Sequence, residues 1–114
     1  LAQISDKALD DAYHYGLSKK GSFGYEANKA SAQAVVDAYN QGVSDLEELS
    51  AAVHEGWSSV AKIFDDPVYQ SKPQKKEARL KLANTRYESL PDEEKEKDRV
   101  VARAVLAAIE PKDQ

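Results

Sequence analysis

The segment "SDLEELSAAVHEGWSSVAKIF", residues 44–64, has the strongest helical pattern in the chain. Its large apolar residues recur at intervals of three and four, which places their side chains on one face of an α-helix. These residues are Leu46, Leu49, Val53, Trp57, Val60 and Phe64. The first four residues match a capping box, in which the Ser44 hydroxyl bonds the backbone amide of Glu47. We therefore expect a central amphipathic helix that buries one face against other helices.

The same apolar spacing on either side of this segment predicts four further helices, at residues 5–17, 30–41, 73–87 and 91–110. The glycines of "GSFGY", residues 21–25, favour a connector between the first two, and Gly42 favours the end of the second. Pro67 is expected to stop the central helix, with a loop through Ser71. No segment alternates as a strand does, so the sequence predicts an all-α fold: a compact, single-domain bundle of about five helices over residues 1–114.

The composition is that of a globular domain and excludes several classes of protein. Of the 114 residues, 41% are hydrophobic and 32% are charged, a balance typical of a chain that folds in water. Without cysteine there is no disulfide, thiolate zinc site or catalytic cysteine. The net charge of −4 argues against nucleic-acid binding, and no apolar stretch is long enough for a membrane span. Because the first residues lack signal-peptide features, we expect a cytoplasmic protein.

Residues that could carry chemistry are few. His14 and His54 lie far apart in the sequence and belong to no metal-binding motif, so we expect neither a metal site nor a cofactor. The carboxylates are numerous, but no spacing singles out a pair for acid and base catalysis. The sequence therefore predicts a protein that is not an enzyme. Trp57, the only tryptophan, is either a core anchor or the wall of a ligand pocket.

A run of charges, "YESLPDEEKEKDR", occupies residues 87–99. Pro91 suits the first position of a helix, and the acidic residues after it suit the positive end of the helix dipole. Asp98 and Arg99 lie where this charged segment meets the apolar stripe of the last helix. A partly buried charge at either residue would require a partner, because an unpaired buried charge is costly.

Two short blocks, "VHEGW" at residues 53–57 and "YESLPDEEKEKDRVV" at residues 87–101, together resemble the RyR (ryanodine receptor) repeat domain of the small bacterial or phage type. The order of the blocks and the spacing within the second agree with that family. The matching residues are His54, Glu55, Trp57, Tyr87, Leu90, Glu94, Lys95, Asp98 and Arg99. The resemblance divides the domain into an N-terminal helical pair, residues 1–43, and an RyR-like portion, residues 44–110.

The resemblance implies a small, non-enzymatic helical binding module. Its ligand would be a small anion, including a nucleotide, or a protein partner. It implies ligand contacts from His54, Trp57, Tyr87 and Arg99, and a structural ion pair of Asp98 and Arg99. The alternative for all of these residues is that they only hold the fold together.

A second hypothesis is a structural or interaction protein of phage or bacterial origin. It would act through self-association into a homo-oligomer or through docking to another protein. Exposed aromatic side chains, which are enriched at interfaces, would form the contact surface. The candidates are Tyr13, Tyr15, Phe23, Tyr25 and Tyr39.

Overall fold

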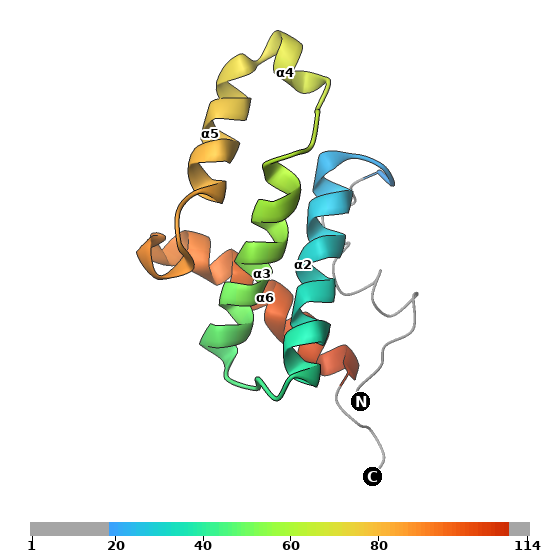
Figure 1. Ribbon diagram of the computed structural model, residues 1–114, viewed down its shortest axis with the longest axis vertical. Helices are drawn as coiled ribbons and strands as arrows, with labels where there is room; N and C mark the ends of the chain where they lie inside the picture. Colours follow the sequence, from blue (N-terminus) through green and yellow to red (C-terminus); the bar gives the residue numbers. More distant parts are fainter. Residues whose placement is uncertain (1–18, 110–114) are drawn as a thin grey trace.

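The computed structural model describes residues 19–109, which form helices and no strand (Figure 1). The elements are α2 (Phe23–Asn40), α3 (Leu46–Ala61), α4 (Val68–Ser71), α5 (Pro73–Ala83), the 3-10 helix η1 (Tyr87–Ser89) and α6 (Asp92–Ile109). The predicted all-α bundle is confirmed. The helix expected over residues 5–17, with His14, Tyr13 and Tyr15, lies outside the described residues. None of the described helices is both long enough and apolar enough to cross a membrane.

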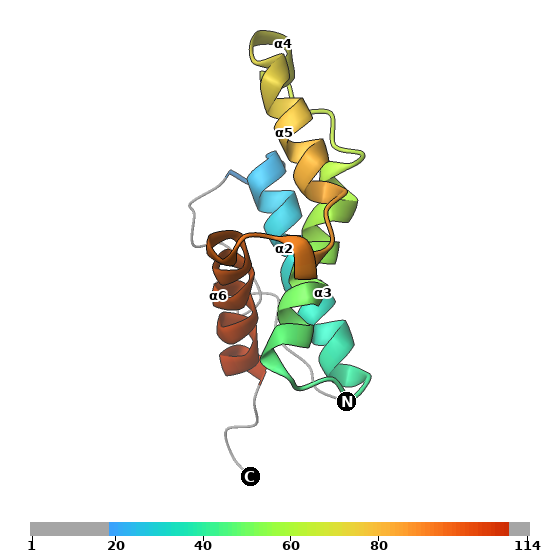
Figure 2. The same ribbon diagram turned by 90° about the vertical axis from the view of Figure 1, so that its left-hand side faces the viewer.

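The core is built from α2, α3 and α6. Helices α2 and α3 lie side by side, α6 crosses one face of the pair, and α4 and α5 extend from the far end of α3 (Figures 1 and 2). Each of the three core helices turns its apolar stripe inward, as the spacing in the sequence predicts. Side chains with 5% exposure or less include Ala32, Val35, Leu49, Val53, Val101 and Val105.

Gly56 and Ser31 hold α2 and α3 unusually close together. A Cβ atom on Gly56 would lie 2.6 Å from the carbonyl oxygen of Ala30, so only glycine fits this position without a shift. The buried Ser31 hydroxyl of α2 lies 2.9 Å from the carbonyl oxygen of Ala27 in the same helix. It also lies 3.1 Å from the carbonyl oxygen of Val53, which is one turn before Gly56 on α3. These contacts fix the register of the pair and so place the residues of α3 relative to α2.

Two predicted helix starts are wrong. Asp45, not Ser44, caps α3, because its carboxylate accepts the Glu48 amide at 3.0 Å. Helix α2 begins at Phe23, where Ser22 accepts the Tyr25 amide, so part of the expected connector is helical. The cause is tertiary: Phe23 and Tyr25 are buried, and this burial outweighs the cost of glycine in the first turn.

The boundaries of the later elements also differ from the prediction. Helix α3 ends at Ala61, three residues before the end of its apolar stripe, and the expected loop through Ser71 contains α4. Helix α5 ends at Ala83 rather than at residue 87, and α6 begins one residue after Pro91. The short turn between α5 and α6 matters most, because it brings Thr85 and η1 against α3.

The surface of exposed aromatics predicted for self-association is wrong for the residues that the structure describes. Phe23 and Tyr25 are buried, at 7% and 9% exposure. Tyr39 is partly buried and packs against the core. These aromatic side chains stabilise the bundle, because they lie on the faces of α2 that contact α3 and α6.

Candidate functional site

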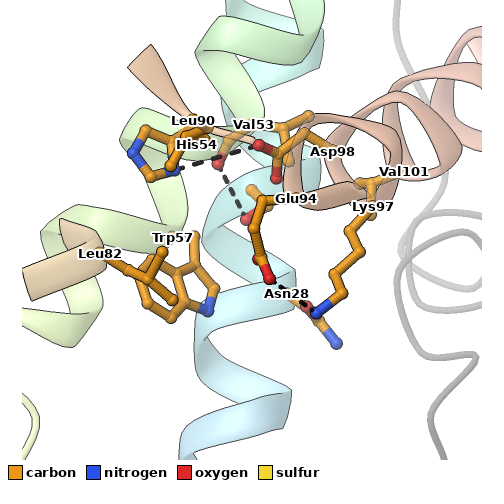
Figure 3. A pocket seen from close by; sticks show the side chains of 11 residues that line it. Asn28, Val53, His54, Trp57, Leu82, Leu90, Glu94, Lys97, Asp98 and Val101 are labelled. Carbon is orange, nitrogen blue, oxygen red and sulfur yellow. Dashed lines mark hydrogen bonds and ion pairs between the residues drawn. The ribbon is translucent and has the colours of Figure 1, made fainter. Parts of the chain in front are cut away.

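A cavity of about 440 Å³ lies where α2, α3, the end of α5 and the start of α6 meet (Figure 3). Its walls are largely apolar, formed by Val53, Leu82, Leu90 and Val101, together with the ring of Trp57. Polar side chains come from α2 (Asn28, Ser31), from α3 (His54) and from α6 (Glu94, Lys97, Asp98). Apolar walls with a few convergent polar groups are typical of small-molecule sites, and the volume falls in their usual range.

His54 is buried and held in one orientation. Its Nε2 atom lies 2.6 Å from the Thr85 carbonyl oxygen. Because a carbonyl oxygen can only accept, Nε2 carries a proton and donates it. In the neutral ring the Nδ1 atom then holds a lone pair, and Nδ1 faces Asp98 with 4.0 Å between it and Oδ2. The contact with Thr85 thus orients the imidazole so that an acceptor faces the cavity.

Asp98 is the most strongly perturbed carboxyl group of the site. Its side chain is only 15% exposed, and burial raises its pKa to about 7, with the charge of Glu94 adding to the increase and that of Lys97 opposing it. The 4.0 Å separation from His54 is too long for a hydrogen bond. Within residues 19–109 the Asp98 carboxyl group makes no hydrogen bond. It therefore lies in the cavity with its hydrogen-bonding capacity unused.

The aromatic side of the cavity is formed by Trp57. Its ring is nearly parallel to that of His54, with 14° between the planes and 6.2 Å between the centroids. Phe23 meets Trp57 edge to face at 5.8 Å, which supports the indole from the side of α2. Trp57 is partly exposed, so it serves as both core anchor and cavity wall.

Tyr87 and Arg99 belong to a separate network around Glu47. The Tyr87 hydroxyl donates to one Glu47 oxygen at 2.8 Å, and the Arg99 Nε atom donates to the other at 2.7 Å. The Arg99 guanidinium also contacts Asp92 at 3.4 Å and Glu96 at 3.3 Å. These hydrogen bonds lower the pKa of Glu47 and raise that of Arg99. The network fastens η1 and the start of α6 to the first turn of α3.

The structure therefore divides the predicted site residues into two groups. His54 and Trp57 line the cavity, whereas Arg99 does not, and Tyr87 lines a second, more polar hollow of about 550 Å³ that shares His54. The predicted ion pair is wrong, because Asp98 and Arg99 do not pair with each other. Adjacent residues point in different directions around a helix, so Asp98 faces His54 and Arg99 faces Glu47.

Several cavity residues were missed by the sequence analysis. Asn28 lies before residue 30, where the sequence predicts the second helix to begin, and Ser31 is an ordinary small polar residue within that predicted helix. Leu82 comes from a segment with strongly polar flanks. Glu94 and Lys97 belong to the charged run that the sequence explains as a helix start; they pair at 3.2 Å, and both line the cavity. Of the polar cavity residues on α6, only Asp98 was singled out by its position, at the point where charge meets the apolar stripe.

The site offers no metal centre: in the described part of the chain, no three His, Asp or Glu side chains are placed to hold an ion. Comparisons of the chain with models of protein families, with curated proteins and with solved structures found no match. The resemblance to RyR repeats therefore stays a prediction that rests on the two sequence blocks.

Proposed function

We propose that this protein is a non-enzymatic binding module that takes a small ligand into the cavity between α2, α3 and α6. The observation that carries the proposal is the buried Asp98 carboxyl group. It faces a cavity large enough for a small molecule and has no hydrogen-bond partner in residues 19–109. A buried polar group without a hydrogen-bond partner lowers the stability of a fold. A ligand that forms hydrogen bonds with the Asp98 carboxyl group would explain why the fold keeps it there.

The RyR resemblance is consistent with this proposal. Its first block contributes His54 and Trp57, and its second contributes Asp98, although residues 58–86 separate the two blocks in the sequence. All three side chains line the same cavity. Membership of that family stays part of the proposal.

The anionic ligand predicted from the sequence has weaker support. Arg99, its expected anchor, is engaged by the carboxylates of Glu47, Asp92 and Glu96 outside the cavity. Among the described residues, Lys97 is the one lysine or arginine that lines the cavity, and it is paired with Glu94. An anion would also meet the Asp98 carboxyl group, so charge favours a different ligand class in this cavity.

A screen of small ring compounds tests the proposal, with cationic, neutral and anionic members. Binding is followed in ¹H–¹⁵N spectra of the protein. We expect some members to shift amide signals around the cavity, including those of Asn28, His54 and Asp98. The proposal is wrong if no compound of any charge shifts these signals, or if the shifts cluster elsewhere.

A pair of leucine variants provides the control. Leu82 and Leu80 are both half-buried on α5, but only Leu82 lines the cavity. Leu82→Phe adds volume at the cavity wall and should weaken binding, because the ligand and the larger ring compete for the same space. Leu80→Phe should leave the affinity unchanged. Equal effects of the two variants would point to a binding site outside the cavity.

A further inference from the structure

We infer that the ligand of this cavity is a small organic cation that carries N–H donors on a flat apolar body, such as an aryl amidine. This inference rests on the proposed function and adds the chemical class of the ligand. Three features of the cavity lead to it: the supply of hydrogen-bond acceptors, the balance of charge and the shape of the apolar wall.

Acceptors outnumber donors among the free polar groups of the cavity. The Asp98 oxygens are unbonded within the described chain, and the Nδ1 atom of neutral His54 presents a lone pair. The one proton of the Ser31 hydroxyl is already shared between two backbone carbonyl oxygens, so this group can offer a ligand only its lone pairs. Donors are fewer: Asn28 contributes an NH₂ group beside its carbonyl oxygen, and the Trp57 indole contributes one N–H. A ligand that satisfies these groups must therefore bring hydrogen-bond donors of its own.

The balance of charge favours a cation. Glu94 and Lys97 pair with each other at 3.2 Å and largely cancel, which leaves the ionised form of Asp98 as the uncompensated charge. A ligand with one positive charge would neutralise it, and hydrogen bonds between charged groups are the stronger kind. An amidinium group would present two N–H donors in one plane to the carboxylate and its neighbour Nδ1.

The apolar wall suits a flat body attached to that cation. Leu82 and Leu90 lie beside Trp57, whose ring is supported by Phe23. An aromatic face attracts a nearby cation and also stacks with a planar ring. The polar and apolar walls together match an amphiphilic molecule with one charged end.

Binding of a cation would be coupled to the proton of Asp98. The charged and titratable groups that face this carboxyl group are His54 from α3 and Glu94 and Lys97 from α6, whereas α2 contributes only uncharged side chains. With a pKa of about 7, Asp98 is largely neutral at pH 5.5 and largely ionised at pH 8. A cation binds the ionised form, so binding releases a proton and affinity rises with pH across this range.

Three ring compounds of matched shape and different charge test the inference: benzamidine, benzamide and benzoate. Their dissociation constants are measured at pH 8 and pH 5.5 through the fluorescence of Trp57, the only tryptophan, and through amide shifts. We expect benzamidine to bind about tenfold more tightly than benzamide at pH 8, as is typical of one hydrogen bond between charged groups, and to lose most of this advantage at pH 5.5. Benzoate should bind most weakly.

A variant that removes the charge of Asp98 tests whether the preference for benzamidine depends on this residue. Asp98→Asn keeps the shape of the side chain and should abolish the preference for benzamidine at both pH values. The control Asp65→Asn makes the same change at an exposed residue outside the cavity and should leave the preference intact.

The outcomes separate the inference from the proposed function. If benzamide or benzoate shifts the cavity signals and binds as tightly as benzamidine, the cavity is a ligand site but the cationic class is wrong. If none of the three compounds binds, the inference fails, and the wider screen then decides the proposed function. A benzamidine preference that survives Asp98→Asn, or that does not change with pH, would also overturn the inference.

Discussion

Asp98 stands where the charged first turns of α6 pass into the buried face of that helix. The nearby Lys97 ammonium group favours the ionised form of the Asp98 carboxyl group. Here burial has the larger effect and raises the pKa from 3.8 to about 7. The same carboxyl group thus lowers the stability of the folded protein when it is ionised and provides the proposed contact with the ligand.

At the same residue, Asp98→Asn should stabilise the protein at pH 8. The raised pKa means that the folded state binds the proton more tightly, so the contribution of Asp98 is most favourable below pH 3.8 and declines as the pH rises to about 7. Above pH 7 the ionised group costs roughly 4 kcal/mol, at about 1.4 kcal/mol for each of the roughly three pKa units of the increase, and asparagine removes this cost. Urea unfolding of both proteins at pH 8 and pH 4.5 measures the difference.

In that experiment the gain should shrink at pH 4.5, where the wild-type carboxyl group is neutral in the folded state. Asp65→Asn serves as the control and should change the free energy of unfolding by less than about 0.5 kcal/mol at either pH, because Asp65 is exposed. A variant that is less stable than the wild type at pH 8 would contradict the raised pKa.

Of the site residues, the sequence could indicate those whose position was unusual in the local pattern. His54 and Trp57 stood out within the VHEGW block, and Asp98 stood out at the change from charged to apolar residues. Asn28 and Ser31 carried no such signal, since a small polar residue on a helix is ordinary until its neighbour in space is known. Glu47 was missed as a partner because it lies 52 residues from Arg99.

Helices α2 and α3 share the most extensive contact among the described elements, and Gly56 lies at that contact. Glycine inside a helix normally costs stability relative to alanine, so its presence in α3 calls for a packing reason. The reason is the backbone of α2, which leaves no room for a Cβ atom near Ala30 and Ser31. The sequence could point to Gly56 as unusual, but only the packing of α2 explains it.

At this contact, Gly56→Ala should destabilise the protein by about 1 to 3 kcal/mol, as overpacking does. The sign is the reverse of that expected from helix propensity, because alanine favours a solvent-facing helix by about 1 kcal/mol over glycine. Thermal unfolding measures the change. Ser59→Ala, at an exposed position of the same helix, should have a small effect, and a Gly56→Ala variant as stable as the wild type would show that the two helices are not in close contact.

Helix α5 is held to the rest of the fold chiefly by Arg79. Its guanidinium lies 3.9 Å from the centre of the Phe23 ring, and its Nη1 atom donates to Asp66 at 2.6 Å and to the Tyr69 hydroxyl at 3.1 Å. Ala83 is the only residue of α5 that is fully buried. The elements α4 and α5 therefore depend on one planar side chain more than on an apolar face.

For this reason, Arg79→Lys should loosen α4 and α5 without unfolding the core, because a lysine ammonium group cannot lie flat on the Phe23 ring while it hydrogen-bonds Asp66 and Tyr69, as the planar guanidinium does. Amide hydrogen exchange should become several-fold faster in α5 and stay unchanged in α3. The control is Arg86→Lys, since the Arg86 side chain is exposed and, within residues 19–109, its one ion pair is the 3.6 Å contact with Glu88. Equal exchange rates in α5 before and after Arg79→Lys would contradict this role.

Across the whole molecule, carboxyl groups of two kinds act on stability in opposite directions. Glu47, Asp66 and Glu96 have pKa values lowered by hydrogen bonds from arginines, whereas Asp98 has a pKa raised by burial. The first three contribute stability above their ordinary pKa values of 3.8 to 4.5, and this stability is lost as the pH falls further. The contribution of Asp98 is lost as the pH rises to about 7.

We therefore expect the melting temperature of the protein to be greatest at mildly acidic pH, in the lower part of the interval between 4.5 and 7. Melting curves at closely spaced pH values measure this optimum. In Asp98→Asn the decline toward pH 7 should be reduced, while the loss below pH 4.5 remains. A wild-type optimum at pH 8 would contradict the balance described here.

At this scale the sequence predicted the class of fold but not how its parts meet. The amphipathic stripes of α3 and α6 were evident in the sequence, and burying them requires an all-helical bundle. The crossing of α6 over the α2 and α3 pair depends on contacts between residues far apart along the chain. The cavity arises from that crossing, so no local pattern could have revealed its volume or its lining.

The most direct test of the account is a titration of the Asp98 side-chain carboxyl carbon by ¹³C NMR, with and without saturating benzamidine. A buried carboxyl group that receives a cationic ligand should titrate with a midpoint near 7 in the free protein, and benzamidine should shift this midpoint to a lower pH. A midpoint near 4 in the free protein would contradict the burial of Asp98. A midpoint near 7 that benzamidine does not move would contradict the contact between this carboxyl group and a cation.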